Sequence, residues 1–258
     1  MLRRWFDAWG AARERRALAR RPISDLLWRR TLRRFPFLAL DDAADGAELL
    51  RLTRLFLDQK EFSAAGGLRL SDDIAVAIAA QACLPVLRLG LEPYAGFVGI
   101  VVHPGQVVAR REFTDDDGIV HDYDEVLAGE AMDGGPVMLS WSDVRRAGRT
   151  TEQGYNVVIH EFAHVLDLGD GVADGMPPLP PGQRPQWQQV LTQDYADFCR
   201  RVDADEPTAL DPYGAENPGE FFAVASEAFF VAPQAMQAEH PALYRLLAGF
   251  YRQDPAAA

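Results

Sequence analysis

The stretch that decides the fold is VVIHEFAHVL, at residues 157–166. His160 and His164 are four residues apart, so on a helix they lie on the same face, about one turn from each other. Two imidazoles placed in this way can both reach one zinc ion at about 2.0–2.1 Å. In this motif Glu161 takes a proton from a metal-bound water and passes it to the leaving amine. The stretch therefore predicts a zinc-dependent hydrolase.

The helix that carries this motif is apolar on most sides. Val158, Ile159, Phe162 and Val165 surround the two histidines, so the helix is expected to lie in the core. On a solvated surface helix the same pattern would be two ordinary exposed histidines. Buried histidines need partners, and a metal ion supplies one. The apolar surroundings therefore favour a metal site.

A catalytic zinc site needs a third protein ligand and an open position for water. Three histidines and three carboxylates are candidates for that ligand: His103, His121, His240, Glu216, Glu220 and Glu227. The histidines are the weaker candidates, because none lies in the downstream helical region where this class usually has its third ligand. Asp167 lies on the face of the motif. It is interpreted either as a hydrogen-bond acceptor for a ligand histidine or as a surface residue at the helix end.

Helical and extended segments follow one another in blocks. Helices are predicted over residues 46–62, 74–84, 151–168, 186–203, 217–231 and 241–251. Strands are predicted over residues 97–102, 107–113, 119–123 and 136–141. This order predicts an α+β fold with a helical N-terminal region and a small, mostly antiparallel sheet.

Three local signals refine this outline. Pro104-Gly105 separates the first two strands, which predicts a hairpin between them. Pro136 opens the last strand and suits an edge strand, of the kind that zinc peptidases use to hold an extended substrate. Thr150, with Gln153 three residues later, predicts a capping box at the start of the metal helix.

The charge of the chain is uneven. The net charge is −12, so binding to a nucleic-acid backbone is not expected. Residues 1–34 nevertheless hold eleven arginines against three acidic residues, which leaves −20 for the rest. These residues are predicted to be a basic helical arm, followed by a single metallopeptidase domain at 35–258. The arm is interpreted as a surface helix docked through Trp5, Phe6 and Trp9, with membrane-surface or partner binding as the alternative.

The compartment is predicted from the cysteines and from the apolar runs. Cys83 and Cys199 are far apart in the sequence and are expected to be free thiols in a reducing compartment. No apolar segment follows the basic N-terminus, so a signal peptide is not expected. The longest apolar runs, such as residues 74–80, are too short to span a bilayer. A cytoplasmic protein is therefore predicted.

Four separated blocks of the sequence resemble the Mlc titration factor A family, which comprises bacterial zinc-dependent peptidases also called anti-repressors. The resemblance covers roughly residues 46–255, and the four blocks agree in order: IAAQACLPVL at 78–87, GPVMLSW at 135–141, HEFAH at 160–164 and NPGEFFA at 217–223. The resemblance implies aminopeptidase-like cleavage of short peptides. The histidine pair four residues apart on an apolar helix predicts about one zinc ion per chain. The resemblance also implies a possible partner, because the named member binds the glucose-regulated repressor Mlc.

The stretch from Tyr213 to Ala223 also resembles the C-terminal catalytic part of anthrax toxin lethal factor. This resemblance implies a zincin-like core of the gluzincin type. It implies that His160, His164 and Glu220 are the metal ligands and that Glu161 is the catalytic base. Tyr213 then matches a tyrosine near the reacting carbonyl.

The residues themselves also favour Glu220 over the other carboxylates. Glu220 and Glu227 are about 10 Å apart along a helix axis, so they cannot both ligate one ion. Glu216 precedes the expected N-cap Asn217 and lies in a loop. Glu220 could instead be only the third member of a capping box. The two phenylalanines that follow it indicate, however, that this first turn is tucked against the core.

Two functions remain open at this level. The first is an enzyme that hydrolyses peptide bonds with a zinc-activated water. The second is a regulatory binding protein in which the zinc helix is structural and a transcriptional repressor of sugar-uptake genes is sequestered. The intact Glu161 favours the enzyme, because a structural site needs no general base. The sequence predicts neither the substrate nor whether cleavage is internal or terminal.

Overall fold

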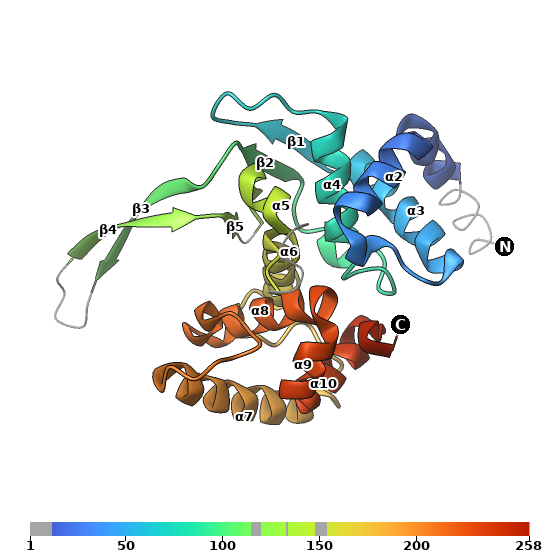
Figure 1. The fold of residues 1–258 in the computed structure, drawn as a ribbon. Coiled ribbons are helices and arrows are strands. Elements are labelled where there is room, and N and C mark those ends of the chain that lie inside the picture. Colours follow the sequence, from blue (N-terminus) through green and yellow to red (C-terminus); the bar gives the residue numbers. More distant parts are fainter. Residues whose placement is uncertain (1–11, 115–119, 133, 148–153, 258) are drawn as a thin grey trace.

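The fold is described by a computed structural model for residues 12–114, 120–132, 134–147 and 154–257. It is an α+β fold, as predicted, with a small four-stranded sheet and a separate two-stranded ribbon among many helices (Figure 1). The helices are α2 (Asp25–Arg34), α3 (Ala43–Gln59), α4 (Asp72–Cys83), α5 (Trp141–Ala147), α6 (Val157–Asp167), α7 (Arg184–Asp203), α8 (Pro218–Val231), α9 (Pro233–Glu239) and α10 (Pro241–Tyr251). The strands are β1 (Glu61–Ala64), β2 (Gly99–His103), β3 (Val107–Thr114), β4 (Val120–Leu127), β5 (Gly129–Ala131) and β6 (Val137–Ser140).

The main sheet is mixed, with the strand order β1-β2-β6-β5. The pairs β1–β2 and β2–β6 are parallel, and only β5–β6 is antiparallel. The prediction of a mostly antiparallel sheet is therefore wrong. All four residues of β6 are buried, as is typical of parallel strands with both faces covered, but a short apolar run does not reveal the direction of its partners.

The predicted hairpin across Pro104-Gly105 is also wrong. β2 is a central strand with β1 on one side and β6 on the other, so it has no free edge for β3. β3 instead pairs with β4 in a separate antiparallel ribbon, with Val107 opposite Leu127 and Thr114 opposite Val120. The ribbon projects from the body of the molecule (Figure 1). Thr114 ends β3, and residues 115–119 lie outside the part of the chain that the structure describes.

The edge strand beside the metal helix is β5, not the strand that follows Pro136. β6 lies between β2 and β5 and is therefore internal. Pro136 precedes the first paired residue, Val137, so its missing N–H costs the sheet no ladder bond. The short β5 has no strong sequence pattern, and its place at the edge depends on pairing with residues that follow it in the chain.

The metal helix α6 begins at Val157, six residues later than predicted. Gly154 has a φ of +73°, which a continuous right-handed helix cannot contain. Asn156 is the N-cap, and its side chain accepts a hydrogen bond from Ile159 N at 3.0 Å. Its amide nitrogen donates to Gln81 Oε1 on α4 at 2.9 Å. Thr150 and Gln153 lie outside the described residues.

The position of α6 is fixed by packing on several sides. It lies between the N-terminal helices and the C-terminal helices, near the middle of the molecule (Figure 1). The Phe162 ring lies 4.9 Å from Tyr94, 5.6 Å from Phe56 and 5.8 Å from Phe97, measured between ring centroids. Aromatic burial of this kind dominates core energetics, so the motif helix is held rigidly.

The described part of the basic arm is packed against the body of the protein. Arg20 forms a two-bonded ion pair with Asp58 on α3, and Thr31 on α2 is buried. Trp5, Phe6 and Trp9 lie outside the described residues, so their predicted docking stays a prediction, as does the domain boundary after residue 34. Within the described ranges, no helix has both the length and the apolar character needed to cross a membrane.

Candidate metal centre

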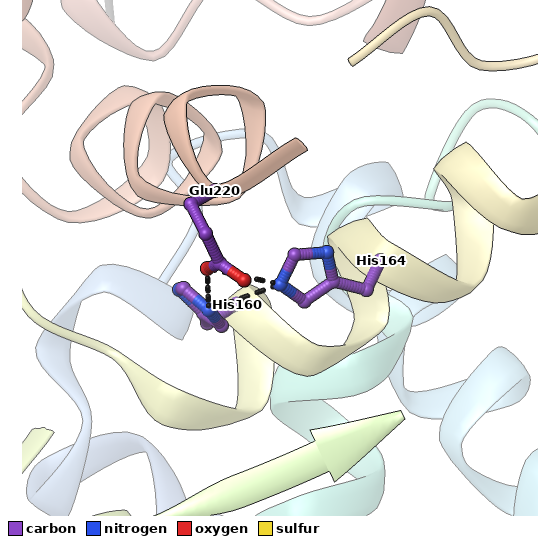
Figure 2. A group of neighbouring side chains, drawn as sticks. All are labelled: His160, His164 and Glu220. Carbon is purple, nitrogen blue, oxygen red and sulfur yellow. Dashed lines mark hydrogen bonds and ion pairs between the residues drawn. The ribbon is translucent and has the colours of Figure 1, made fainter. Parts of the chain in front are cut away.

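Helices α6 and α8 bring together three side chains, His160, His164 and Glu220 (Figure 2). Glu220 Oε2 lies 3.0 Å from His160 Nε2 and 3.2 Å from His164 Nε2. The two Nε2 atoms are 3.1 Å apart. Among the described residues, this is the one group of three or more metal-binding side chains that converges in this way.

The converging atoms fit a zinc ion. Four ligands at about 2.0–2.1 Å in a tetrahedron are separated from one another by about 3.3–3.4 Å. The three observed distances of 3.0–3.2 Å need to widen by only a few tenths of an ångström. Two imidazole nitrogens and one carboxylate oxygen are also a ligand set found in catalytic zinc sites. The side chains are 12–17% exposed, so one side of the cluster is open to a further ligand.

Helix α8 presents Glu220 through its N-terminal turn. Asn217 is the N-cap, as predicted, and its side chain accepts a hydrogen bond from Glu220 N at 3.0 Å. The Glu220 carboxylate does not close the capping box but points to the histidines (Figure 2). Burial alone would raise the pKa of Glu220, but its hydrogen bonds to the two histidines lower it to about 2. This carboxyl is therefore held ionised, as a metal ligand must be.

Glu227 occupies the far side of His160. Its Oε1 accepts a hydrogen bond from His160 Nδ1 at 2.7 Å, and its Oε2 accepts one from the Asn156 N–H. A neutral His160 that donates from Nδ1 to this carboxylate would have its Nε2 free to bind a metal ion. Burial opposes the charged form of His160, but Glu227 and Glu220 together raise its pKa well above the usual range.

From the sequence, Glu227 was considered only as a candidate metal ligand, and its hydrogen bond to His160 was not predicted. The sequence contains a signal for this contact, because Glu227 lies inside the apolar run from Ala223 to Val231. A carboxylate buried there needs a hydrogen-bond partner.

We expect Glu227→Gln to weaken zinc binding about 10–100-fold, because the outer partner of a ligand histidine sets its orientation and basicity. Competition with a chromogenic chelator would measure the zinc affinity. The thermal midpoint of the variant separates this effect from a folding defect. Unchanged affinity in a folded variant would show that Glu227 does not support the site.

Glu161 is buried beside the cluster, with 5% of its surface exposed. Burial raises its pKa to about 7. A Cβ atom added at Gly129 on β5 would lie 2.3 Å from Glu161 Oε1, so the edge strand can approach this closely only as glycine. Glu161 also lines a cavity of about 330 Å³, together with His160 and Tyr213. A buried base is therefore confined between the metal cluster and the edge strand.

Tyr213 reaches the same cavity from the short helical turn Pro212–Ala215. Its ring lies 6.1 Å from the His160 ring, and the residue is 42% exposed. The Asp211 side chain accepts a hydrogen bond from Tyr213 N at 2.9 Å, which fixes the start of the turn. The structure thus brings Tyr213 next to the cluster. Glu216 lines the cavity as well but does not belong to the three converging side chains.

The remaining candidates lie elsewhere. His103 ends β2, and His121 belongs to β4. His240 is buried near Asp194 and Glu239, at 3.8 and 3.3 Å. Asp167 is fully buried and is not a surface residue, since its carboxylate accepts a hydrogen bond from Gly175 N at 2.8 Å. It ties the loop after α6 to the metal helix.

Two histidines one turn apart, a facing carboxylate and a buried glutamate beside an edge strand are the arrangement expected of a metallopeptidase. Comparison with known proteins also indicates a metallopeptidase. The family described as glucose-regulated metallo-peptidase M90 matches residues 9–252. The chain belongs to this family.

Relatives cover most of the chain. An Mlc titration factor A of Salmonella arizonae is 36% identical over 236 residues, 90% of this chain and 93% of the relative. An Mlc titration factor A of Edwardsiella ictaluri is 38% identical over 227 residues, 85% of both chains. An uncharacterised protein of Synechocystis is 38% identical over 226 residues, 86% of this chain and 82% of the relative. The resemblance seen in the four sequence blocks is therefore confirmed.

Proposed function

We propose that the chain is a zinc-dependent peptidase with a gluzincin-type site, in which His160, His164 and Glu220 hold one zinc ion. The observation that carries this proposal is the convergence of three donor atoms within 4.8 Å of one another, directly beside the buried Glu161. Bound zinc would lower the pKa of a water molecule and polarise the scissile carbonyl.

The chain's own residues supply the proton transfers. Glu161 accepts a proton from the attacking water while the new C–O bond forms at the carbonyl carbon. It then delivers this proton to the amine nitrogen while the C–N bond breaks, so a carboxylic acid and an amine result. Glu161 suits this role because it is buried directly after His160 in the chain and lines the same cavity as His160 and Tyr213. Tyr213 donates its O–H to the carbonyl oxygen as negative charge develops there.

The edge strand supports a peptide substrate. β5 lies against Glu161 through Gly129, and within the described residues it pairs with β6 alone. An extended peptide can add to such an edge through main-chain hydrogen bonds. The family resemblance suggests short peptides cut from the amino end, in the cytoplasm. The two free cysteines are consistent with a reducing compartment.

A regulatory function is the second candidate. It is favoured by one observation, that relatives 36–38% identical over most of the chain are named Mlc titration factor A. Those names describe proteins that titrate Mlc. The present chain would then bind a repressor on a surface separate from the metal centre, and both functions could exist in one molecule.

The peptidase proposal is tested by digesting a peptide library with zinc-loaded protein and mapping the products by mass spectrometry. We expect cleavage by the wild type and about one zinc per chain, whereas His164→Ala should lose both, because two ligands hold zinc poorly. His103→Ala is the matched control and should keep both. Hydrolysis by a zinc-free His164→Ala protein would sink the proposal.

A further inference from the structure

The loop after α6 contacts both helices that carry the candidate metal ligands. It follows Asp167, the last residue of α6, three positions beyond His164. Residues 171–176 of this loop also lie against the first turn of α8, which contains Glu220. We call residues 171–176 the bridging loop, because it connects the helix of the two histidines with the helix of the carboxylate.

Asp167 holds the bridging loop at α6. The residue is fully buried, and its Oδ2 accepts a hydrogen bond from the Gly175 N–H at 2.8 Å. The other oxygen, Oδ1, is buried and has no hydrogen-bond partner among the described residues. Asp167 therefore makes its hydrogen bond to the loop and not to His164. A buried carboxylate is unfavourable unless it is hydrogen-bonded, so this one bond indicates what Asp167 does.

Gly175 is held through both of its peptide groups. The indole N–H of Trp187 on α7 donates to the Gly175 carbonyl oxygen at 2.8 Å, and Trp187 is itself buried. The φ of Gly175 is +78°, a left-handed conformation that favours glycine. The backbone at Gly175 is therefore fixed from α6 and from α7.

The bridging loop meets α8 with backbone against backbone. A Cβ atom added at Gly175 would lie 2.5 Å from the Pro218 carbonyl oxygen, its closest neighbour. A Cβ atom added at Gly219 would lie 3.1 Å from the Ala173 carbonyl oxygen. No side chain separates the two segments at these points, and packed interiors transmit displacements. A shift of the loop must therefore move the first turn of α8, in which Glu220 is the next residue.

We propose that Asp167 and Gly175 are positioning residues of the metal centre, which set the distance from Glu220 to the two histidines through the bridging loop. This inference rests on the proposed function, in which Glu220 is the third ligand. Ligand distances in a metal site must hold to within about 0.2 Å. Glu220 is the third residue of α8, and helix ends fray, so the support must come from outside the helix.

Two glycines of the bridging loop give a matched test. Gly175→Ala places a methyl group against Pro218 and should push the first turn of α8 away from α6. Gly171→Ala is the control, because Gly171 also has a positive φ, +91°, but a Cβ atom added there meets nothing within 4 Å. Both variants strain the backbone in the same way. We expect zinc affinity, measured by chelator competition, to fall about 10–100-fold for Gly175→Ala and to be unchanged for Gly171→Ala.

Asp167 tests the same loop from the side of α6. Asp167→Ala removes the acceptor of the Gly175 N–H and should weaken zinc binding about 10–100-fold. Asp167→Asn keeps an acceptor oxygen, so it should restore an affinity close to that of the wild type. Asp143→Ala removes another buried carboxylate and is the control for a general loss of stability. It should lower the thermal midpoint without changing zinc affinity. If Gly175→Ala does not fold, the Asp167 variants decide alone.

A double-mutant cycle with Glu220→Ala identifies the ligand through which Asp167 acts. Once Glu220 is absent, Asp167→Ala should weaken zinc binding little further, because effects in one pathway are not additive. Full additivity would overturn the inference, since Asp167 would then act through His164 or through the whole fold. Wild-type affinity of a folded Asp167→Ala protein, or equal affinities of the two glycine variants, would overturn it as well.

A failure of the proposed function is distinguishable, because the bridging loop can be followed without metal. In the zinc-free full chain, hydrogen exchange measured by mass spectrometry should be faster in Asp167→Ala over residues 171–176 and 217–222, but not over α10. A wild-type protein that binds no zinc and shows this exchange pattern would reject the metal centre and keep the support of α8. Unchanged exchange over residues 217–222 would reject the support itself.

Discussion

Glu161→Gln is expected to keep zinc and the fold and to lose hydrolysis by about 10²–10⁴-fold, the contribution typical of a positioned general base. Glutamine has nearly the same shape, so it fits the narrow space beside Gly129 where Glu161 is buried. Its amide cannot accept the proton of the attacking water. Steady-state hydrolysis of the best library peptide, with zinc measured by elemental analysis on the same sample, tests this result.

The matched control is Glu216→Gln, which changes a second carboxylate lining the same cavity but outside the three converging side chains. It should retain most of the activity. Near wild-type turnover by zinc-loaded Glu161→Gln would remove Glu161 from the mechanism. The same variant separates the two candidate functions, because binding of Mlc by an inactive Glu161→Gln protein would show that regulation does not need hydrolysis.

The second large effect is expected for Glu220→Ala. Glu220 Oε2 is the atom that faces both histidine Nε2 atoms, at 3.0 and 3.2 Å. Its removal should weaken zinc binding by more than the roughly 10–100-fold that the loss of an outer contact costs. Chelator competition measures the affinity, and circular dichroism verifies the fold. Glu216→Ala should bind zinc normally, and the reverse order of the two variants would mean that the wrong carboxylate was chosen.

Tyr213→Phe provides a contrast within the same series. It removes one hydroxyl at the edge of the cavity and no proposed ligand, so zinc affinity should be unchanged. Turnover should fall by up to about 10²-fold, since a lost oxyanion donor costs about 10²–10³ in a fully enclosed site. Tyr213 is 42% exposed, which argues for the lower part of that range. Loss of zinc from this variant would assign Tyr213 a structural role instead.

Local signals in the sequence predicted the longer helices from α3 onward, whereas the short helices α5 and α9 and the strand β1 were not predicted. Asn217 and Pro218 mark the start of α8, and Pro85 follows the end of α4 at Cys83, because caps and prolines act on their own neighbours. The start of α6 was missed since the left-handed φ of Gly154 has no strong local signature. The spacing of His160 and His164 was sufficient to predict that both face one point on the helix.

Non-local pairing was predicted poorly. Pro104-Gly105 looks like a hairpin turn, yet β2 pairs with β1 and β6, whose residues begin 38 positions before and after it. The same limit applies to Glu227, whose contact with His160 joins residues 67 positions apart. Glu220 could be predicted from the sequence as the third candidate ligand, because its helix cap, its apolar neighbours and the resemblance to known peptidases all indicate the same residue.

The contacts of His160 determine whether the metal centre is ordered before or after an ion binds. Glu227 accepts a hydrogen bond from the His160 imidazole and a second one from the Asn156 N–H, and the Asn156 side chain donates to Gln81. The polypeptide therefore orients the imidazole by itself. In small zinc fingers the ion supplies the folding free energy, so metal capture and folding are one event. Here packing of the large core orders the ligand side chains during folding, so their conformational entropy is lost before an ion binds. The metal centre is therefore expected to be ordered before an ion binds, so that metal binding is an event separate from folding.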